Sequence, residues 1–177
     1  MKLRKEELRV LLVDWSLSYL ADLKSELEDK GFKNITGCND GESAIRHIDE
    51  FEPHILLVDQ EVKYNDGLSI LQYVKEQELE IAVIFTSSCA SEMLFRKANM
   101  LGVKLIIAKP TSIEVITERI EDIYQMIEFR KVEEEMIQEY AMEKEYELEE
   151  DPLELIDEIG LENNIGRILL GFGIRAN

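Results

Sequence analysis

Short apolar runs that end in a polar residue recur along the chain and constrain its fold more than any other feature. In one of them, four branched apolar residues at 55–58 are followed at once by Asp59. A short continuous apolar run between turn signals is typical of a strand that is buried on both faces of a sheet. We predict five such strands, over residues 9–14, 34–38, 55–58, 81–86 and 103–108.

Segments with helical periodicity separate these runs and follow the last of them. The first helix has Ser16 or Ser18 as a candidate N-cap and Gly31 as a candidate end. Its apolar face is predicted to consist of Leu17, Leu20, Leu23 and Leu27. The other helices are predicted to start at Asp40-Gly41, to cover residues 67–77 and 91–101, and to begin again at Ser112.

Strands that alternate with helices in this way predict βαβ units and therefore a parallel sheet. Right-handed crossovers place the helices on both faces of such a sheet. The predicted fold is α/β, a doubly wound five-stranded parallel sheet of the flavodoxin-like order 2-1-3-4-5. An all-helical C-terminal extension follows it. In this order the switch point lies between the first and third strands, which end at Asp14 and Asp59.

Four polar residues come directly after four different predicted strands: Asp14, Asp59, Thr86 and Lys109. The carboxyl ends of parallel strands meet at one edge of the sheet, so these side chains are predicted to share one crevice. Two carboxylates can share a small hard cation, and a carboxylate is a competent nucleophile for phosphorus. Lysine supplies a positive charge for a phosphoryl group, and threonine supplies a hydroxyl donor. The alternative for Asp59 alone is that it caps the loop after its strand.

Residues 9–127 resemble the receiver domain of two-component response regulators, the CheY-like family. The resemblance implies that Asp59 accepts a phosphoryl group from a histidine kinase or a phosphotransferase. It rests on four segments: Val10-Leu11-Leu12-Val13-Asp14, Leu56-Leu57-Val58-Asp59 with Asp66-Gly67, Phe85-Thr86-Ser87, and Ala108-Lys109-Pro110.

The resemblance also implies roles for the other residues at the strand ends. Thr86 corresponds to the switch hydroxyl of the family, and Lys109 to its conserved ammonium, followed by a cis peptide bond at Pro110. The chain departs from the family at Ile106, where receivers carry an aromatic switch residue three positions before the lysine. An isoleucine is stiff at χ1, so it is less able to swing between buried and exposed rotamers.

A magnesium site is implied by the same resemblance, with Asp14, Asp59 and the backbone carbonyl of Glu61 as its protein ligands. Receivers usually carry two adjacent acids after the first strand, and the second is the direct metal ligand. Here that position is Trp15. Because an indole offers a donor and no acceptor lone pair, we expect weaker magnesium binding unless Asp14 or the Glu61 side chain compensates. The alternative function is a phosphorylation-independent, degenerate receiver that acts as an adaptor or dimerisation module.

The charge balance excludes several partners. With 20 basic and 38 acidic residues, the formal net charge is −18, which disfavours binding to nucleic acid or to an anionic membrane surface. No apolar segment approaches the length of a membrane span. Cys38 and Cys89 have no metal-ligand spacing and are expected to be buried or partly buried thiols. We expect a cytoplasmic signalling protein rather than an enzyme.

The region after the receiver is predicted to be helical and acidic. Isoleucines from Ile113 to Ile127 follow a 3-4 spacing that suits either the domain core or a coiled-coil seam. Residues 128–151 carry 11 acidic and 3 basic side chains and consist mainly of helix formers. We predict that this segment continues the fifth helix, with a thin apolar stripe of Val132, Met136 and Tyr140, and binds an output protein or a second copy as a homodimer. A flexible acidic linker is the alternative.

Residues 152–177 are predicted to form a short helical tail. Residues 155–160 with Ile165 faintly resemble the opening of the DNA-binding domain of the sporulation master-regulator family. No basic recognition helix follows in this sequence, so we expect no DNA binding by this chain. A truncated transcriptional regulator of the sporulation type is therefore a further alternative. The predicted division is a receiver over 1–127, an acidic extension over 128–151 and a tail over 152–177.

Overall fold

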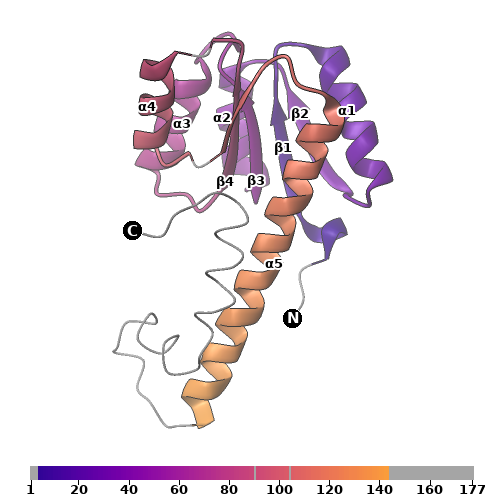
Figure 1. Ribbon diagram of the computed structural model, residues 1–177, viewed down its shortest axis with the longest axis vertical. Coiled ribbons are helices and arrows are strands. Elements are labelled where there is room, and N and C mark those ends of the chain that lie inside the picture. The colour runs from indigo at the N-terminus through magenta and orange to yellow at the C-terminus, as the bar shows by residue number, and fades with distance from the viewer. Residues whose placement is uncertain (1–3, 90, 104, 144–177) are drawn as a thin grey trace. The chain divides into compact units, whose positions relative to one another are not determined.

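The computed structural model describes residues 4–89, 91–103 and 105–143, and it confirms the predicted α/β fold (Figure 1). Five parallel strands lie in the order β2-β1-β3-β4-β5. The strands are β1 (Arg9–Val13), β2 (Asn34–Cys38), β3 (Ile55–Asp59), β4 (Ala82–Ser87) and β5 (Leu105–Ala108). The helices are α1 (Leu17–Asp29), α2 (Gly41–Phe51), α3 (Gly67–Glu76), α4 (Glu92–Met100) and α5 (Ile113–Glu143). A 3-10 turn, η1 (Lys5–Glu7), precedes β1 and was not predicted.

The sheet has a hydrophobic core on each face because successive strand residues point to opposite sides. On one face, Leu11 and Val13 of β1 join Leu56 and Val58 of β3 beneath α2, α3 and α4. On the other face, residues 10 and 12 of β1 and 55 and 57 of β3 pack against α1 and α5. Both faces of the central strands are therefore covered, which explains why their sequences are continuous apolar runs rather than alternating ones.

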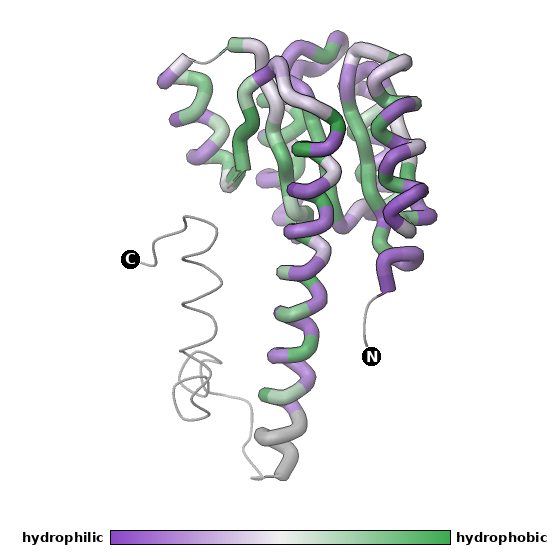
Figure 2. The backbone as a smooth tube through the Cα atoms, turned by 45° about the vertical axis from the view of Figure 1, so that its right-hand side comes forward, coloured by the Kyte–Doolittle hydropathy of each residue, from purple (hydrophilic) through white to green (hydrophobic). Residues whose placement is uncertain are grey.

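The isoleucine spacing of α5 serves the domain core. Ile116 and Ile120 are fully buried in the cluster under α1 and α5, and Ile113, Ile123 and Ile127 pack against it. Of the two possibilities that the sequence left open for this segment, the described residues therefore support core packing. Figure 2 shows the apolar positions of α5 interrupted by hydrophilic ones along the helix.

Side-chain caps fix where the helices begin, and therefore how the loops leave the strands. The Ser16 hydroxyl accepts a hydrogen bond from the backbone N–H of Tyr19, so Ser16 rather than Ser18 is the N-cap of α1. Asp40 caps α2 and Asp66 caps α3 in the same way. Gly31, with a φ of 96°, takes the left-handed conformation just after α1 that the sequence predicted for it.

Two side chains differ from the sequence predictions. Leu17 does not join the apolar face of α1, because it is the first helical residue and is 65% exposed. Cys89 is exposed, which contradicts the expectation of a buried or partly buried thiol, because it lies in the loop after β4 rather than in the strand. Cys38 is buried as expected, at the end of β2, and burial raises the pKa of its thiol to about 12.

The chain divides into two compact units between Ile127 and Glu128. In the second unit the described part of α5 continues as helix to Glu143, with Val132 and Met136 exposed. The predicted extension from residue 139 on, which includes Tyr140, and the predicted tail at 152–177 lie outside the residues described at side-chain level. None of the helices in the described ranges combines the length and the apolar character needed to cross a bilayer.

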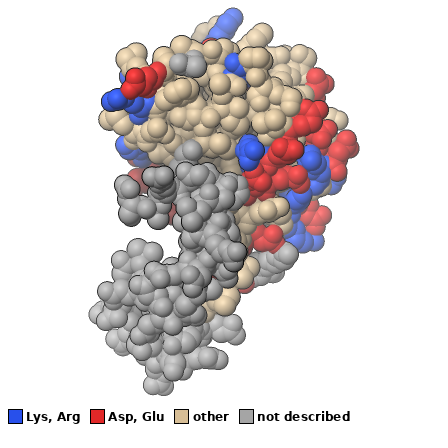
Figure 3. Space-filling model, in the orientation of Figure 1, with Lys and Arg blue, Asp and Glu red and all other residues tan. Residues whose placement is uncertain are grey.

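Charged side chains are unevenly distributed over the receiver surface. On the face drawn in Figure 3, acidic side chains gather on the side where α1 lies, and Lys and Arg are interspersed among them. Asp22 and Glu28 of α1 are both exposed. The upper part of the same view, where the carboxyl edge of the sheet lies, shows few charges.

The loop between β3 and α3 is held against the start of α2. The backbone N–H of Gly41 donates to the carbonyl of Lys63 at 2.8 Å. Tyr64 and Asn65 follow with positive φ values of 50° and 71°, which non-glycine residues rarely adopt. A Cβ on Gly41 would lie 1.9 Å from the carbonyl oxygen of Asn65. The close approach of the two backbones therefore requires glycine at this position.

Gly41→Ala should consequently destabilise the receiver. The added methyl group meets backbone atoms, which must move, and we expect a loss of about 1–3 kcal/mol in the free energy of unfolding measured by urea denaturation. Gly37→Ala is the matched control, because the nearest atoms to its Cβ are 3.8 Å away, an ordinary contact. Equal stability of the two variants would contradict this account of the loop.

Candidate functional site

The four polar residues predicted at the strand ends lie together at the carboxyl edge of the sheet. Asp59 is the last residue of β3 and pairs in register with Thr86 of β4. Asp14 follows β1, and Lys109 follows β5. Asp14, Asp59 and Thr86 are all buried, at 2%, 0% and 2% exposure. Because β1 and β4 flank β3, Asp59 occupies the middle of this group.

Lys109 connects the two carboxylates. Its Nζ lies 2.6 Å from Asp14 Oδ2 and 3.0 Å from Asp59 Oδ1. The peptide bond that follows, Lys109–Pro110, is cis. Burial acts to lower the pKa of Lys109, but hydrogen bonds to Asp14 and Asp59 outweigh it and raise the pKa. The side chain is therefore a protonated ammonium at neutral pH, and it bridges two buried anions.

The two carboxylate oxygens of Asp59 differ: one has partners, and the other, which we call open, has none among the described residues. Oδ1 accepts from Thr86 Oγ1 at 3.3 Å and pairs with Lys109. Oδ2 is buried and has no hydrogen-bond partner among the described residues. Burial raises the pKa of Asp59, and the hydrogen bond and charge of Lys109 act in the opposite direction. A buried carboxylate oxygen without a partner is costly, so Oδ2 is suited to an incoming electrophile or cation.

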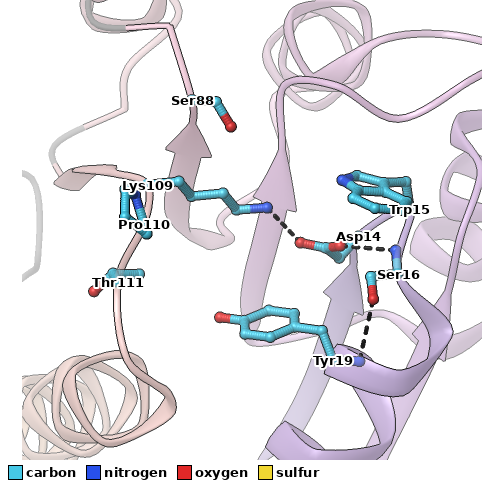
Figure 4. Close-up of a pocket in the computed structure, with 8 residues that line it drawn as sticks. All are labelled: Asp14, Trp15, Ser16, Tyr19, Ser88, Lys109, Pro110 and Thr111. Atoms are coloured by element: carbon cyan, nitrogen blue, oxygen red, sulfur yellow. Dashed lines mark hydrogen bonds and ion pairs between the residues drawn. The ribbon is translucent and has the colours of Figure 1, made fainter.

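An open cleft of about 570 Å³ is lined by two members of this group, Asp14 and Lys109, while Asp59 lies beneath them and does not line it (Figure 4). Its lining includes Asp14, Trp15, Tyr19, Ser88, Lys109 and Pro110. Trp15 is 58% exposed, so the indole lies at the surface beside the carboxylates rather than in the core. The cleft thus combines a bridging cation with aromatic and apolar walls.

The residues present fit a magnesium ion that keeps several of its waters. The open Oδ2 of Asp59 and the carboxylate of Asp14 are oxygen ligands of the kind that Mg²⁺ prefers. Both Asp14 oxygens already have partners, however: Oδ1 accepts from the backbone N–H of Ser16 at 2.9 Å, and Oδ2 pairs with Lys109. Within the described ranges, no group of three or more His, Cys, Asp or Glu side chains is arranged to hold a metal.

Glu61 and Ser88 form a contact that the sequence did not predict. The Glu61 carboxylate accepts from the backbone N–H of Ser88 at 3.1 Å and from its hydroxyl at 3.0 Å. This pair joins the loop after β3 to the loop after β4. The Glu61 side chain is therefore engaged by Ser88 in this structure and does not take the place of the acid that Trp15 replaces. The only sequence signal for Ser88 is its position two residues after Thr86.

Gly67, Tyr19 and Ile106 also lie at or near the site; the sequence singled out Gly67 as a turn residue and Ile106 as a departure from the family, and gave no role to Tyr19. A Cβ on Gly67 would lie 2.7 Å from the carbonyl oxygen of Asp59, so this glycine lets α3 start directly beside the strand end. Its signal was the Asp66-Gly67 turn. Tyr19 faces Lys109 from α1, and helical periodicity gave no indication of that. Ile106 is half-buried in β5 and packs against the core under α2, α3 and α4.

Known proteins share both the sequence and the fold of this region. A probable chemotaxis protein CheY from Rhizobium etli is 30% identical over 121 residues, 67% of this chain and 94% of that protein. A protein-glutamate methylesterase/protein-glutamine glutaminase from Geobacter sulfurreducens is 30% identical over 125 residues, 68% of this chain but only 33% of that protein.

Solved structures show the same fold. The signal receiver domain of a putative LuxO repressor protein from Vibrio parahaemolyticus superimposes with a TM-score of 0.64 at 20% identity, over 70% of this chain and 95% of that one. CheY in a CheX-CheY-BeF3-Mg complex from Borrelia burgdorferi gives a TM-score of 0.59 at 26% identity, over 66% and 89%.

The sequence itself assigns the family. The family model of the response regulator receiver domain matches residues 10–121, which is more than half of the chain. This match agrees with the resemblance drawn from the motifs and with the strand order of the sheet. The chain belongs to the response regulator receiver family and carries a receiver domain of two-component signalling.

Proposed function

We propose that Asp59 is the phosphoacceptor of this receiver and takes its phosphoryl group from a histidine kinase or a phosphotransferase. The observation that carries the proposal is the open Oδ2 of Asp59, buried beside an ammonium that is shared with a second carboxylate. In the transfer an Asp59 oxygen bonds to phosphorus while the bond from phosphorus to the donor histidine nitrogen breaks, and the imidazole leaves with that electron pair.

Lys109 and Thr86 have complementary roles in this proposal. The Lys109 ammonium is close enough to Asp59 to bind an oxygen of the incoming phosphoryl group, where it offsets the added negative charge. The Thr86 hydroxyl donates to Asp59 now and can donate to a phosphoryl oxygen after transfer. A change in the hydrogen-bond partner of the Thr86 hydroxyl would alter the conformation of β4 and of the loop that starts after Ser87. This conformational change is the signal that reaches other proteins.

We further propose that Asp14, Asp59 and the backbone carbonyl of Glu61 hold Mg²⁺ with low affinity. The ion, when bound, supplies charge neutralisation for the phosphoryl oxygens. The low affinity is supported by Trp15, which has no acceptor for a cation, and by the engagement of both Asp14 oxygens. The chemistry at Asp59 therefore relies on Lys109 more than it would in a receiver with two adjacent acids.

The alternative is a phosphorylation-independent adaptor. Trp15 at the metal position and Ile106 at the switch position favour it, because each removes a part that phosphorylation-dependent signalling uses. In either case we propose that an output protein or a second copy binds through α5 and its extension, where Val132 and Met136 are exposed on a helix that runs to Glu143. The molar mass in solution, measured by light scattering, distinguishes a second copy from another partner.

Asp59 should become phosphorylated when the protein is incubated with magnesium and a small phosphodonor such as acetyl phosphate. We expect a mass increase of one phosphoryl group that is labile, as an acyl phosphate is, and that is absent from Asp59→Asn. Asp22→Asn is the matched control, because this aspartate is exposed on α1 and should leave phosphorylation intact. An unmodified wild-type protein, or equal modification of Asp59→Asn, would refute the phosphoacceptor role and favour the adaptor.

Trp15→Asp should strengthen magnesium binding. The substitution adds a carboxylate at the position of the missing acid, and we expect the dissociation constant for Mg²⁺, measured by isothermal titration calorimetry, to fall by at least about ten-fold. Trp15→Phe removes the indole without adding a ligand and should bind Mg²⁺ as weakly as the wild type. If Trp15→Asp and Trp15→Phe bind the ion equally, the missing acid at position 15 is not what limits the site.

A further inference from the structure

Tyr19 lies against the ammonium group of Lys109. The centre of its ring is 5.6 Å from Lys109 Nζ, within the range of a cation–π interaction. Figure 4 shows the ring extending from α1 into the cleft, beside the end of the Lys109 side chain and across from Pro110. The ammonium therefore contacts three groups from three parts of the chain: Asp14 after β1, Asp59 in β3 and Tyr19 in α1.

The position of Tyr19 is coupled to that of Asp14. Asp14 Oδ1 accepts from the backbone N–H of Ser16, and the Ser16 hydroxyl accepts from the backbone N–H of Tyr19. These two hydrogen bonds set the start of α1 relative to the strand end. As a consequence, the carboxylate and the ring that contact Lys109 are held in one local arrangement.

A lysine side chain needs such a restraint. It has four methylene groups with rotatable bonds and a strongly hydrated ammonium group. Two carboxylates therefore fix the position of the ammonium but not the conformation of the methylene chain that leads to it. An aromatic face on a further side of the ammonium attracts it and excludes water from it. The Tyr19 hydroxyl itself is buried and has no hydrogen-bond partner among the described residues. The ring, rather than the hydroxyl, is thus the part of Tyr19 that contacts the site.

We propose that Tyr19 is a positioning residue whose ring face holds the Lys109 ammonium between Asp14 and Asp59. The inference rests on the proposed role of Lys109 in phosphotransfer, but the contact itself does not depend on that role. Without the ring, Lys109 reaches solvent more often, and Asp59 loses part of the positive charge that its phosphorylation uses.

Two substitutions separate the ring from the hydroxyl. Tyr19→Phe keeps the aromatic face, and Tyr19→Leu removes it while keeping an apolar side chain in the cleft. The first readout is the rate at which an acylating reagent labels Lys109, measured by peptide mass spectrometry relative to the exposed Lys97 of α4 in the same sample. We expect Tyr19→Leu to raise this relative rate roughly five-fold, and Tyr19→Phe to leave it near the wild-type value.

The second readout is the initial rate of Asp59 phosphorylation by acetyl phosphate with magnesium, which should fall in Tyr19→Leu and be retained in Tyr19→Phe. Leu17→Ala, an exposed position on the same turn of α1, is the control for nonspecific effects on the helix, and circular dichroism verifies folding. Wild-type labelling of Lys109 in Tyr19→Leu would overturn the proposal, as would equal effects of the two tyrosine variants. If the wild type accepts no phosphoryl group, the labelling still decides the role of Tyr19, and only the proposed function fails.

Discussion

The ammonium of Lys109 holds two buried carboxylates together at the carboxyl edge of the sheet. Asp14 and Asp59 approach this edge on neighbouring strands, and two like charges removed from water would repel each other without a cation between them. Lys109 reaches them from beyond β5, two strands away from Asp59. The strand order that creates the switch point therefore also creates the need for this lysine and the path by which it arrives.

Trp15 changes the charge balance of this arrangement. A second acid after β1 would leave three carboxylates around one ammonium, and a divalent cation would be needed to offset them. With Trp15 at that position, Lys109 faces two carboxylates, one of which has an open oxygen. The site is thus closer to neutrality without a metal than one with three acids. This balance supports the proposal that the site holds magnesium weakly.

The sequence was sufficient for the fold and for the positions of the strand-end residues. Continuous apolar runs predicted the buried strands, and the residues that interrupt them, Asp14 and Asp59, are found at one edge because parallel strands end there. Contacts between side chains from distant parts of the chain could not be predicted, because no periodicity links Glu61 to Ser88 or Tyr19 to Lys109. The predicted burial of two side chains was wrong, because Leu17 is the first residue of α1 and Cys89 lies in the loop after β4, and both are exposed.

The measurement that tests this account most directly is the stability of Lys109→Met with and without Asp59→Asn. If the ammonium holds two buried anions, Lys109→Met should lower the free energy of unfolding at pH 7 by about 3–5 kcal/mol, because it leaves both carboxylates uncompensated. Asp59→Asn added to it should restore most of that loss by removing one of them. A Lys109→Met variant as stable as the wild type, or a double variant no more stable than Lys109→Met, would contradict the account.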